Sequence, residues 1–287
     1  MDELTVVLKA REFVNWANPS EFPVSMQAYV GQIGGVLRIA TELRPDEPGW
    51  SFQKPNGEYC ICVNGKDSPE RQRFTICHEV AHIVTGLPSD HGGPAWSYAK
   101  RPPNEILCDV FASELLLPYK LFKPKVAEAD VALAAIDRLA GEFEASVLAT
   151  GSRFAAFADI PCAFVFAEGG KVRYCSRSTT LRAANAWVAP RMDLPAASLA
   201  GRCRGGAPND GAEEVPADIW FEDWSREGTL IEDARHNGRW DQTIALLWFE
   251  DDDVPPPREE RHHREIEEFG LAELDGVLPW PGKRRRR

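Results

Sequence analysis

The sequence lacks the features that mark secreted, membrane-bound or disulfide-stapled proteins. No apolar run reaches the roughly 18 residues that a membrane-spanning helix needs. The N-terminal residues MDELTVVLKAREF do not follow the pattern of a signal peptide. The seven cysteines are odd in number and contain no C-x-x-C pair, so neither a zinc ribbon nor a disulfide framework is supported. These absences predict a reduced, cytoplasmic protein that does not enter a membrane.

Positive charge is also scarce. The chain has 33 Lys and Arg against 44 Asp and Glu, which gives a formal net charge of −11. A nucleic-acid-binding protein normally carries a basic face, so this balance disfavours direct contact with DNA. The 287 residues, 44% of them hydrophobic, are enough for a sizeable core in one large domain or two ordinary ones.

The first part of the chain mixes helix and strand signals. Residues 1–22 show little periodicity and predict a loosely docked arm. Ser25 is suited to cap a short helix, and VLRIATEL then alternates like a strand. The segment GWSFQKPNGEYCICVNG predicts a hairpin that turns at Pro55–Gly57.

Two longer helices follow. The first is expected to begin near Pro69 and to end at Gly86, because its apolar residues recur with a helical period between these two signals. The second, EILCDVFASELLLP, is expected to be capped by Asn104 and ended by Pro118.

The second half of the chain changes from helix to strand. Residues 131–158 predict two helices with a break near Gly141 and with Ser146 as the second cap. Past Pro161 a first hairpin is expected at Gly169-Gly170. A second is expected at Asn237-Gly238, the preferred pair for a two-residue type I′ turn.

The strongest chemical signal is HEVAH at residues 78–82. Side chains four apart share one face of a helix, so His78 and His82 can present two imidazoles to one metal ion. Glu79 is rotated about 100° from His78, which suits a general base beside the ligands better than a ligand. An H-E-x-x-H match also occurs by chance in a helix whose histidines are simply hydrogen-bonded, and a catalytic zinc site needs a third protein ligand.

The third ligand does not come from the same helix. Metzincins have a histidine six residues after the second one and a glycine three residues after it, but this chain has Pro88 and Thr85 there. His91 is the next histidine, in a Gly- and Pro-rich loop at no recognised spacing. The second helix offers Glu105 and, one turn later, Asp109, in a pairing that resembles the E-x-x-x-D arrangement of gluzincin peptidases.

The two helices together resemble the ImmA/IrrE family of metallo-endopeptidases. In that family an R-x-R-F-T-x-x-H-E-x-x-H helix precedes an E-x-x-A-N-x-F-A-x-x-L-L-x-P helix, and RQRFTICHEVAHIV and EILCDVFASELLLP follow the same order here. The similarity covers roughly residues 25–160. Cys108 replaces the usual Ala and Asp109 the usual Asn, and both changes keep the character of the site.

The resemblance implies a zinc site with defined roles. His78, His82 and Glu105 would bind Zn²⁺, Asp109 would accept a hydrogen bond from a ligating histidine, and Glu79 would be the general base. An oxyanion-stabilising partner is also expected, and three residues are candidates for it: His91, Tyr98 and Tyr119.

The resemblance also predicts the architecture, an α+β fold with a zincin-like, α-rich metallopeptidase domain and helix-turn-helix-like helices, followed by a smaller antiparallel β domain. Some members of the family carry a GAF-type sensor domain at the second position, and the hairpins are compatible with one. Arg153 is the only basic residue on the second helix of the pair, which favours a packing role over DNA reading. The expected division is residues 1–24 as an N-terminal arm, 25–126 as the metallopeptidase domain, 127–160 as a helical hairpin packed on it, 161–252 as the β domain and 253–287 as a charged tail.

Two functions follow as hypotheses. In the first, the protein is a cytoplasmic zinc metallo-endopeptidase that cuts a regulatory protein, and the resemblance suggests an XRE-type transcriptional repressor in a stress response or a toxin–antitoxin pair. In the second, the metal is structural, with His91 as a possible fourth ligand. The protein would then sequester a repressor or bind a small ligand without cutting anything.

Overall fold

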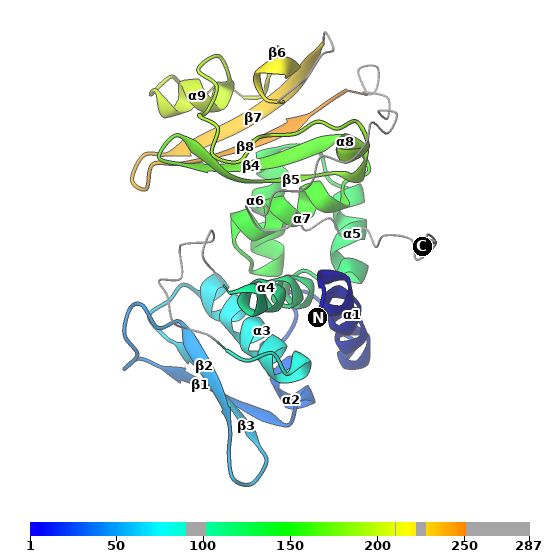
Figure 1. The fold of residues 1–287 in the computed structure, drawn as a ribbon, viewed down its shortest axis with the longest axis vertical. Helices are drawn as coiled ribbons and strands as arrows, with labels where there is room; N and C mark the ends of the chain where they lie inside the picture. Colours follow the sequence, from blue (N-terminus) through cyan, green and yellow to red (C-terminus); the bar gives the residue numbers. More distant parts are fainter. Residues whose placement is uncertain (90–101, 210, 222–227, 251–287) are drawn as a thin grey trace, which may run out of the picture.

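The computed structural model describes residues 1–89, 102–209, 211–221 and 228–250. It is an α+β protein in three tiers (Figure 1). A small sheet and the two motif helices form one end, a layer of helices lies in the middle, and a five-stranded antiparallel sheet forms the other end. Within the described residues no helix is long and apolar enough to cross a membrane.

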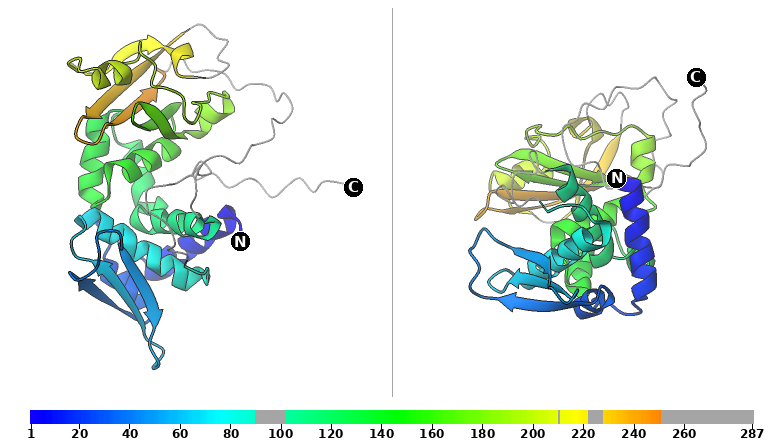
Figure 2. Two further views of the ribbon diagram at one scale, coloured as in Figure 1. Left: turned by 60° about the vertical axis from the view of Figure 1, so that its left-hand side comes forward. Right: turned by 60° about the horizontal axis from the view of Figure 1, so that its bottom comes forward.

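The chain begins with a docked helix. Helix α1 (Glu3–Ala17) is capped by the Asp2 side chain, which accepts a hydrogen bond from the Thr5 amide. It buries four apolar residues in the main core and packs against α4 (Pro103–Leu116). The ribbon of α1 lies against the body of the protein in Figures 1 and 2. The buried residues are Val6, Ala10, Phe13 and Val14. The prediction of a loosely docked arm over residues 1–22 is therefore wrong.

A three-stranded sheet supports the first motif helix. Helix α2 (Met26–Gln32), capped by Ser25 as expected, leads into β1 (Gly35–Ala40). Strand β3 (Tyr59–Asn64) lies in the centre, parallel to β1 and antiparallel to β2 (Gly49–Gln53). The β2–β3 hairpin and its turn agree with the prediction, and Gly57 has the positive φ of 87° that favours glycine.

The two motif helices form as the sequence indicates, with one difference. Helix α3 (Pro69–Thr85) has Ser68 as its cap and ends at Gly86, which adopts a left-handed conformation. Helix α4 begins at Pro103, so Asn104 lies inside its first turn and does not cap it. Proline at the first helical position sets φ for the helix and donates no amide hydrogen, which explains the earlier start.

The middle layer contains one helix that the sequence did not indicate. Helix α5 (Tyr119–Ala127) begins directly after Pro118 and precedes α6 (Leu133–Phe143) and α7 (Val147–Phe157). Ser146 caps α7 as expected. Helix α6 runs past Gly141 because Phe143, fully buried, packs against Phe22 and Phe122.

The second sheet has the order β5-β4-β8-β7-β6, and all its neighbouring pairs are antiparallel. One face joins the main core against α6 and α7, and the other packs in a second core with α8 (Thr179–Ala183) and α9 (Leu199–Arg204). The strands are β4 (Cys162–Glu168), β5 (Lys171–Arg177), β6 (Glu213–Pro216), β7 (Thr229–Asn237) and β8 (Gln242–Trp248). A likeness to GAF-type sensor domains stays a prediction.

The β7–β8 connection differs from the predicted type I′ turn. Asn237 pairs with Gln242, so residues 238–241 form a four-residue loop. Asp241 has a positive φ of 47°, and its carboxylate pairs with Arg204 of α9 through two hydrogen bonds of 2.8 Å. Its carbonyl also accepts the Gly169 amide from the other hairpin. Contacts that are distant in sequence thus decide this loop.

A buried ion pair joins the middle layer to α4. Arg153 of α7 donates to the Glu114 carboxylate at 2.8 Å and to the Leu117 carbonyl at 2.9 Å. The Arg153 guanidinium also lies over the Phe157 ring. Arg153 and Glu114 are both buried, so Arg153 serves packing, as the sequence predicts for this helix pair.

The docking of α1 can be tested by truncating its core side chain. Phe13→Ala should lower the free energy of unfolding by about 3–5 kcal/mol, because it leaves a cavity against Tyr29 and Phe111. Leu8→Ala, at a half-exposed position on the same helix, is the control and should change the free energy of unfolding by less than about 0.5 kcal/mol. Urea denaturation monitored by circular dichroism measures both. Equal effects would contradict a docked α1.

The buried ion pair makes a second prediction. Arg153→Met should destabilise the protein by about 3–5 kcal/mol, since it leaves the Glu114 carboxylate buried without its main partner. The double variant Arg153→Met/Glu114→Gln should be more stable than Arg153→Met alone because the stranded charge is gone. Urea unfolding of the three proteins gives the comparison. A double variant less stable than the single one would count against this account.

Candidate metal centre

Helices α3 and α4 bring three candidate ligands together. His78, His82 and Glu105 each offer one ligand atom, and these atoms all lie within 4.8 Å of one another. His78 Nε2 is 3.1 Å from Glu105 Oε2, and His82 Nε2 is 3.5 Å from Glu105 Oε1. All three residues are buried. The tertiary structure therefore places Glu105 opposite both histidines, as the two sequence patterns predict.

The outward-facing nitrogens of the two imidazoles are held by oxygen atoms. His78 Nδ1 lies 2.9 Å from Asp109 Oδ1, and His82 Nδ1 lies 2.9 Å from the Leu87 carbonyl oxygen. Carboxylate and carbonyl oxygens only accept hydrogen bonds, so each Nδ1 carries the hydrogen and donates. In the neutral imidazoles, both Nε2 atoms then face each other and Glu105, each with a lone pair for a metal ion.

The same partners determine how readily the histidines keep a proton. Burial lowers the pKa of His78, but hydrogen bonds to Asp109 and Glu105 outweigh it and raise the pKa to about 9. Burial likewise lowers the pKa of His82. Contacts with Cys108, Glu105 and the Leu87 carbonyl outweigh burial there and raise the pKa to about 10. In the absence of metal the cluster therefore attracts protons at neutral pH.

Glu79 lies outside the ligand cluster and faces the small sheet. The residue is 1% exposed, and its Oε2 accepts a hydrogen bond of 2.6 Å from the Ser51 hydroxyl of β2. Ser51 was not among the predicted site residues. The only sequence signal for it is its place in a strand two residues after Gly49, which puts both on one face of β2.

Cys108 is a second residue that the sequence left unassigned. Its sulfur lies 3.4 Å from His82 Nδ1, on the side of the ring that faces away from Glu105. The position is fully buried, so this small residue fills the space behind the histidine. Its signal in the sequence is the departure from the family pattern, in which this position is Ala.

The three oxyanion candidates have different outcomes. Tyr119 begins α5, where its ring packs against Phe157 and beneath the Arg11 guanidinium. Glu105 lies in the first turn of the 14-residue α4, about 16 Å along the helix axis from its last residue, Leu116, and Tyr119 lies past that end. The structure therefore does not bring Tyr119 to the three candidate ligands, and its oxyanion role stays a prediction. His91 and Tyr98 lie outside the described residues.

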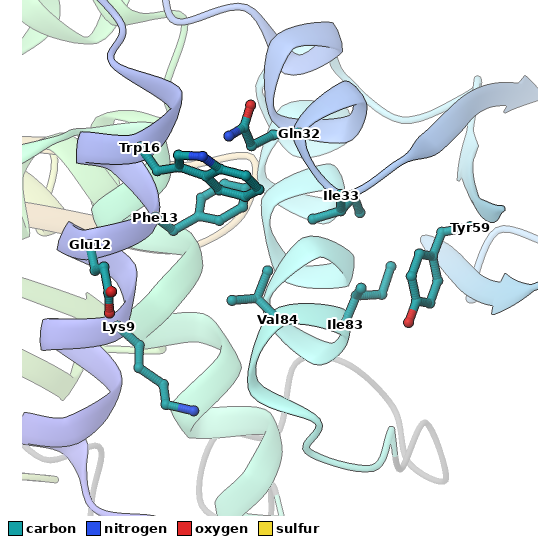
Figure 3. A pocket seen from close by; sticks show the side chains of 9 residues that line it. All are labelled: Lys9, Glu12, Phe13, Trp16, Gln32, Ile33, Tyr59, Ile83 and Val84. Atoms are coloured by element: carbon teal, nitrogen blue, oxygen red, sulfur yellow. The ribbon is translucent and has the colours of Figure 1, made fainter. Parts of the chain in front are cut away.

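A pocket of about 520 Å³ opens between α1, α2, α3 and the start of β3 (Figure 3). Ile83 and Val84 contribute to it from α3, and Trp16 and Tyr59 line it from α1 and β3. None of the cluster residues His78, His82 and Glu105 lines it. It is a feature of the surface beside the metal site and not a part of that site.

The donor set fits a zinc ion. Two imidazole nitrogens and one carboxylate make up a common ligand set of catalytic zinc, which leaves a further position for water or substrate. Each imidazole is oriented through its other nitrogen, as is usual for metal-ligating histidines. The geometry therefore suits a site that binds a metal ion, and the buried charge of Glu105 would be balanced by that ion.

Comparison with known proteins agrees with this site. Residues 37–154 match the family Peptidase_M78, described as the IrrE N-terminal-like domain. This match assigns that part of the chain to the family. The match includes most of β1, all of β2 and β3, and both motif helices, so the matched residues contain all three candidate metal ligands. It supports a metallopeptidase-type function.

A solved structure resembles more of the chain. A Mycobacterium tuberculosis transcriptional regulator superposes with a TM-score of 0.54 at 12% sequence identity, over 85% of this chain and 76% of that one. At this identity the likeness concerns the fold alone, and it reaches beyond the IrrE N-terminal-like domain. No curated protein matches the sequence significantly.

The raised histidine pKa values predict that metal binding competes with protons. At pH 7 the metal-free cluster holds protons that a metal ion must displace, so Zn²⁺ should bind more tightly as the pH rises from 6 towards 9. Calorimetric titration at pH 7, in two buffers with different ionisation enthalpies, should show release of about one proton or more per Zn²⁺. The variant Asp109→Asn, which removes one cause of the raised pKa of His78, should release fewer protons for each Zn²⁺ ion bound. A binding heat that is independent of the buffer would contradict the prediction.

Proposed function

We propose that the protein is a zinc-dependent endopeptidase that hydrolyses a peptide bond in a specific regulatory protein. The observation that carries the proposal is the position of Glu79. Its carboxylate is adjacent in sequence to the ligand candidate His78 but is bonded to Ser51 of β2 and belongs to no metal-ligating group in the described residues. A purely structural metal site does not require a buried carboxylate that lies next to a ligand in the sequence and does not itself bind the metal.

His78, His82 and Glu105 would hold the zinc ion, and Asp109 and the Leu87 carbonyl would keep the two imidazoles oriented. Zinc, when bound, would polarise the scissile carbonyl group and acidify a water molecule. Glu79 would accept the proton of the attacking water and deliver it to the leaving amine. Burial of Glu79 keeps its carboxylate away from bulk water, so this proton stays within the site.

For the substrate we propose an XRE-type transcriptional repressor in the cytoplasm, cut as part of a stress response or a toxin–antitoxin pair. The support is the resemblance of the two motif helices to the ImmA/IrrE family. The similar Mycobacterium tuberculosis structure is titled a transcriptional regulator, which is compatible with a role in gene control. The net charge of −11 and the burial of Arg153 favour a protein substrate over direct binding to DNA.

Glu79→Gln tests the reaction. The variant keeps the size of the side chain but removes the general base, so it should bind Zn²⁺ like the wild type and cleave at least about 100-fold more slowly. The substrates are a proteome-derived peptide library and the XRE-type repressor encoded nearest to the gene. Cleavage products are identified by mass spectrometry, and zinc content by elemental analysis.

Glu105→Ala is the matched variant on α4. It should lose both zinc and cleavage, because it removes one of three ligands. Equal cleavage by the wild type and by Glu79→Gln would refute the peptidase. Stoichiometric zinc without any cleavage of either substrate would favour the alternative, a metal-containing protein that only binds its partner.

A further inference from the structure

Strand β2 contacts Glu79 through a side chain that no motif contains. The Ser51 hydroxyl donates to Glu79 Oε2 at 2.6 Å, which is short and typical of a hydrogen bond to a charged acceptor. The contact joins residues 28 positions apart, and Glu79 has almost no exposure to solvent.

The backbone beneath Ser51 holds β2 close to α3. Gly49, two residues earlier on the same face, has no room for a side chain. A Cβ atom there would lie 2.6 Å from the Cys62 carbonyl oxygen and 2.7 Å from the Thr75 methyl group. Thr75 is one helical turn before Glu79 on α3. The close approach at Gly49 therefore sets the distance at which Ser51 meets Glu79.

The loop that leads into β2 is held as well. Asn64, fully buried at the end of β3, donates through its side chain to the carbonyl oxygens of Arg44 and Glu47. Its backbone amide donates to the Pro48 carbonyl at 2.8 Å. Three hydrogen bonds from one residue thus place the start of β2 before Gly49 and Ser51 follow.

We propose that Ser51 is a positioning residue that holds the Glu79 carboxylate in one orientation for proton transfer. The inference rests on the proposed function, in which Glu79 is the general base. A glutamate side chain rotates about three bonds, and a misplacement of about 1 Å can cost on the order of 100-fold in rate. A hydroxyl group on a rigid strand removes that freedom at one carboxylate oxygen, while the metal ligands are held by other groups.

The kinetic test compares three variants on β2, using a peptide that the zinc-loaded wild type cleaves in the library. Ser51→Ala should lower kcat on the order of 10-fold and change KM by less than about twofold, because the lost hydrogen bond acts on the reaction and not on substrate binding. Ser51→Thr keeps the hydroxyl group and should recover most of kcat. Gln53→Ala, two residues further on the same strand, is the control and should behave like the wild type. Zinc content should stay unchanged in all three.

A double-mutant cycle in the metal-free protein tests the contact without any activity measurement. Ser51→Ala should lower the urea midpoint when residue 79 is Glu, and should lower it clearly less in the Glu79→Ala background. The difference reports the Ser51–Glu79 interaction in the folded protein. Additive effects would mean that the hydroxyl does not hold the carboxylate.

The outcomes separate this inference from the proposed function. Cleavage by Glu79→Gln at the wild-type rate would overturn the proposed peptidase function. The positioning role would be overturned if Ser51→Ala kept the wild-type kcat, if Ser51→Thr were as slow as Ser51→Ala, or if the denaturation cycle showed no coupling. Loss of kcat in Ser51→Ala, recovery in Ser51→Thr and coupling in the cycle would together establish it.

Discussion

The packing of α3 on α4 gathers His78, His82 and Glu105 in a cluster with almost no access to water, and Glu79 of α3 is buried as well. Buried charges are costly unless they are paired and hydrogen-bonded, so the surrounding structure has to supply partners for each of them. Asp109 and the Leu87 carbonyl orient the histidines, and Ser51 bonds to Glu79. The small sheet, the end of α3 and the first turns of α4 thus all serve one desolvated group of side chains.

The rest of the fold holds α4 in place. Helix α1 covers it from one side, and the Arg153–Glu114 pair joins its last turn to α7. Helix α7 in turn packs on β4, where Gly151 leaves room for the Phe164 ring. Strand β7 also fixes the layer of helices α5 to α7, because the Asp233 carboxylate accepts a hydrogen bond from the Leu133 amide at the start of α6. The five-stranded sheet and the cluster of candidate metal ligands are therefore connected through a continuous set of packed elements.

Local signals predicted the elements around the site well. The H-E-x-x-H spacing, Pro69 and Gly86 defined α3, and the carboxylates at 105 and 109 placed two groups on one face of α4. These features succeed because a helix relates residues three or four apart whatever surrounds it. Errors arose where distant contacts decide. The segment expected to be a loose arm forms helix α1, because its apolar residues pack in the core with α4. The conformation of the β7–β8 loop depends on the hydrogen bond between Arg204 and Asp241 and not on the Asn-Gly pair.

The sequence by itself determined which groups could form the site, since residue types and helical spacing alone put two histidines on one face and two carboxylates on another. Only the tertiary structure decided that these faces meet and that Ser51 reaches Glu79. The reason is physical. Spacing along a helix is set by local backbone geometry, whereas the approach of β2 to α3 depends on close packing at Gly49, between segments far apart in the chain.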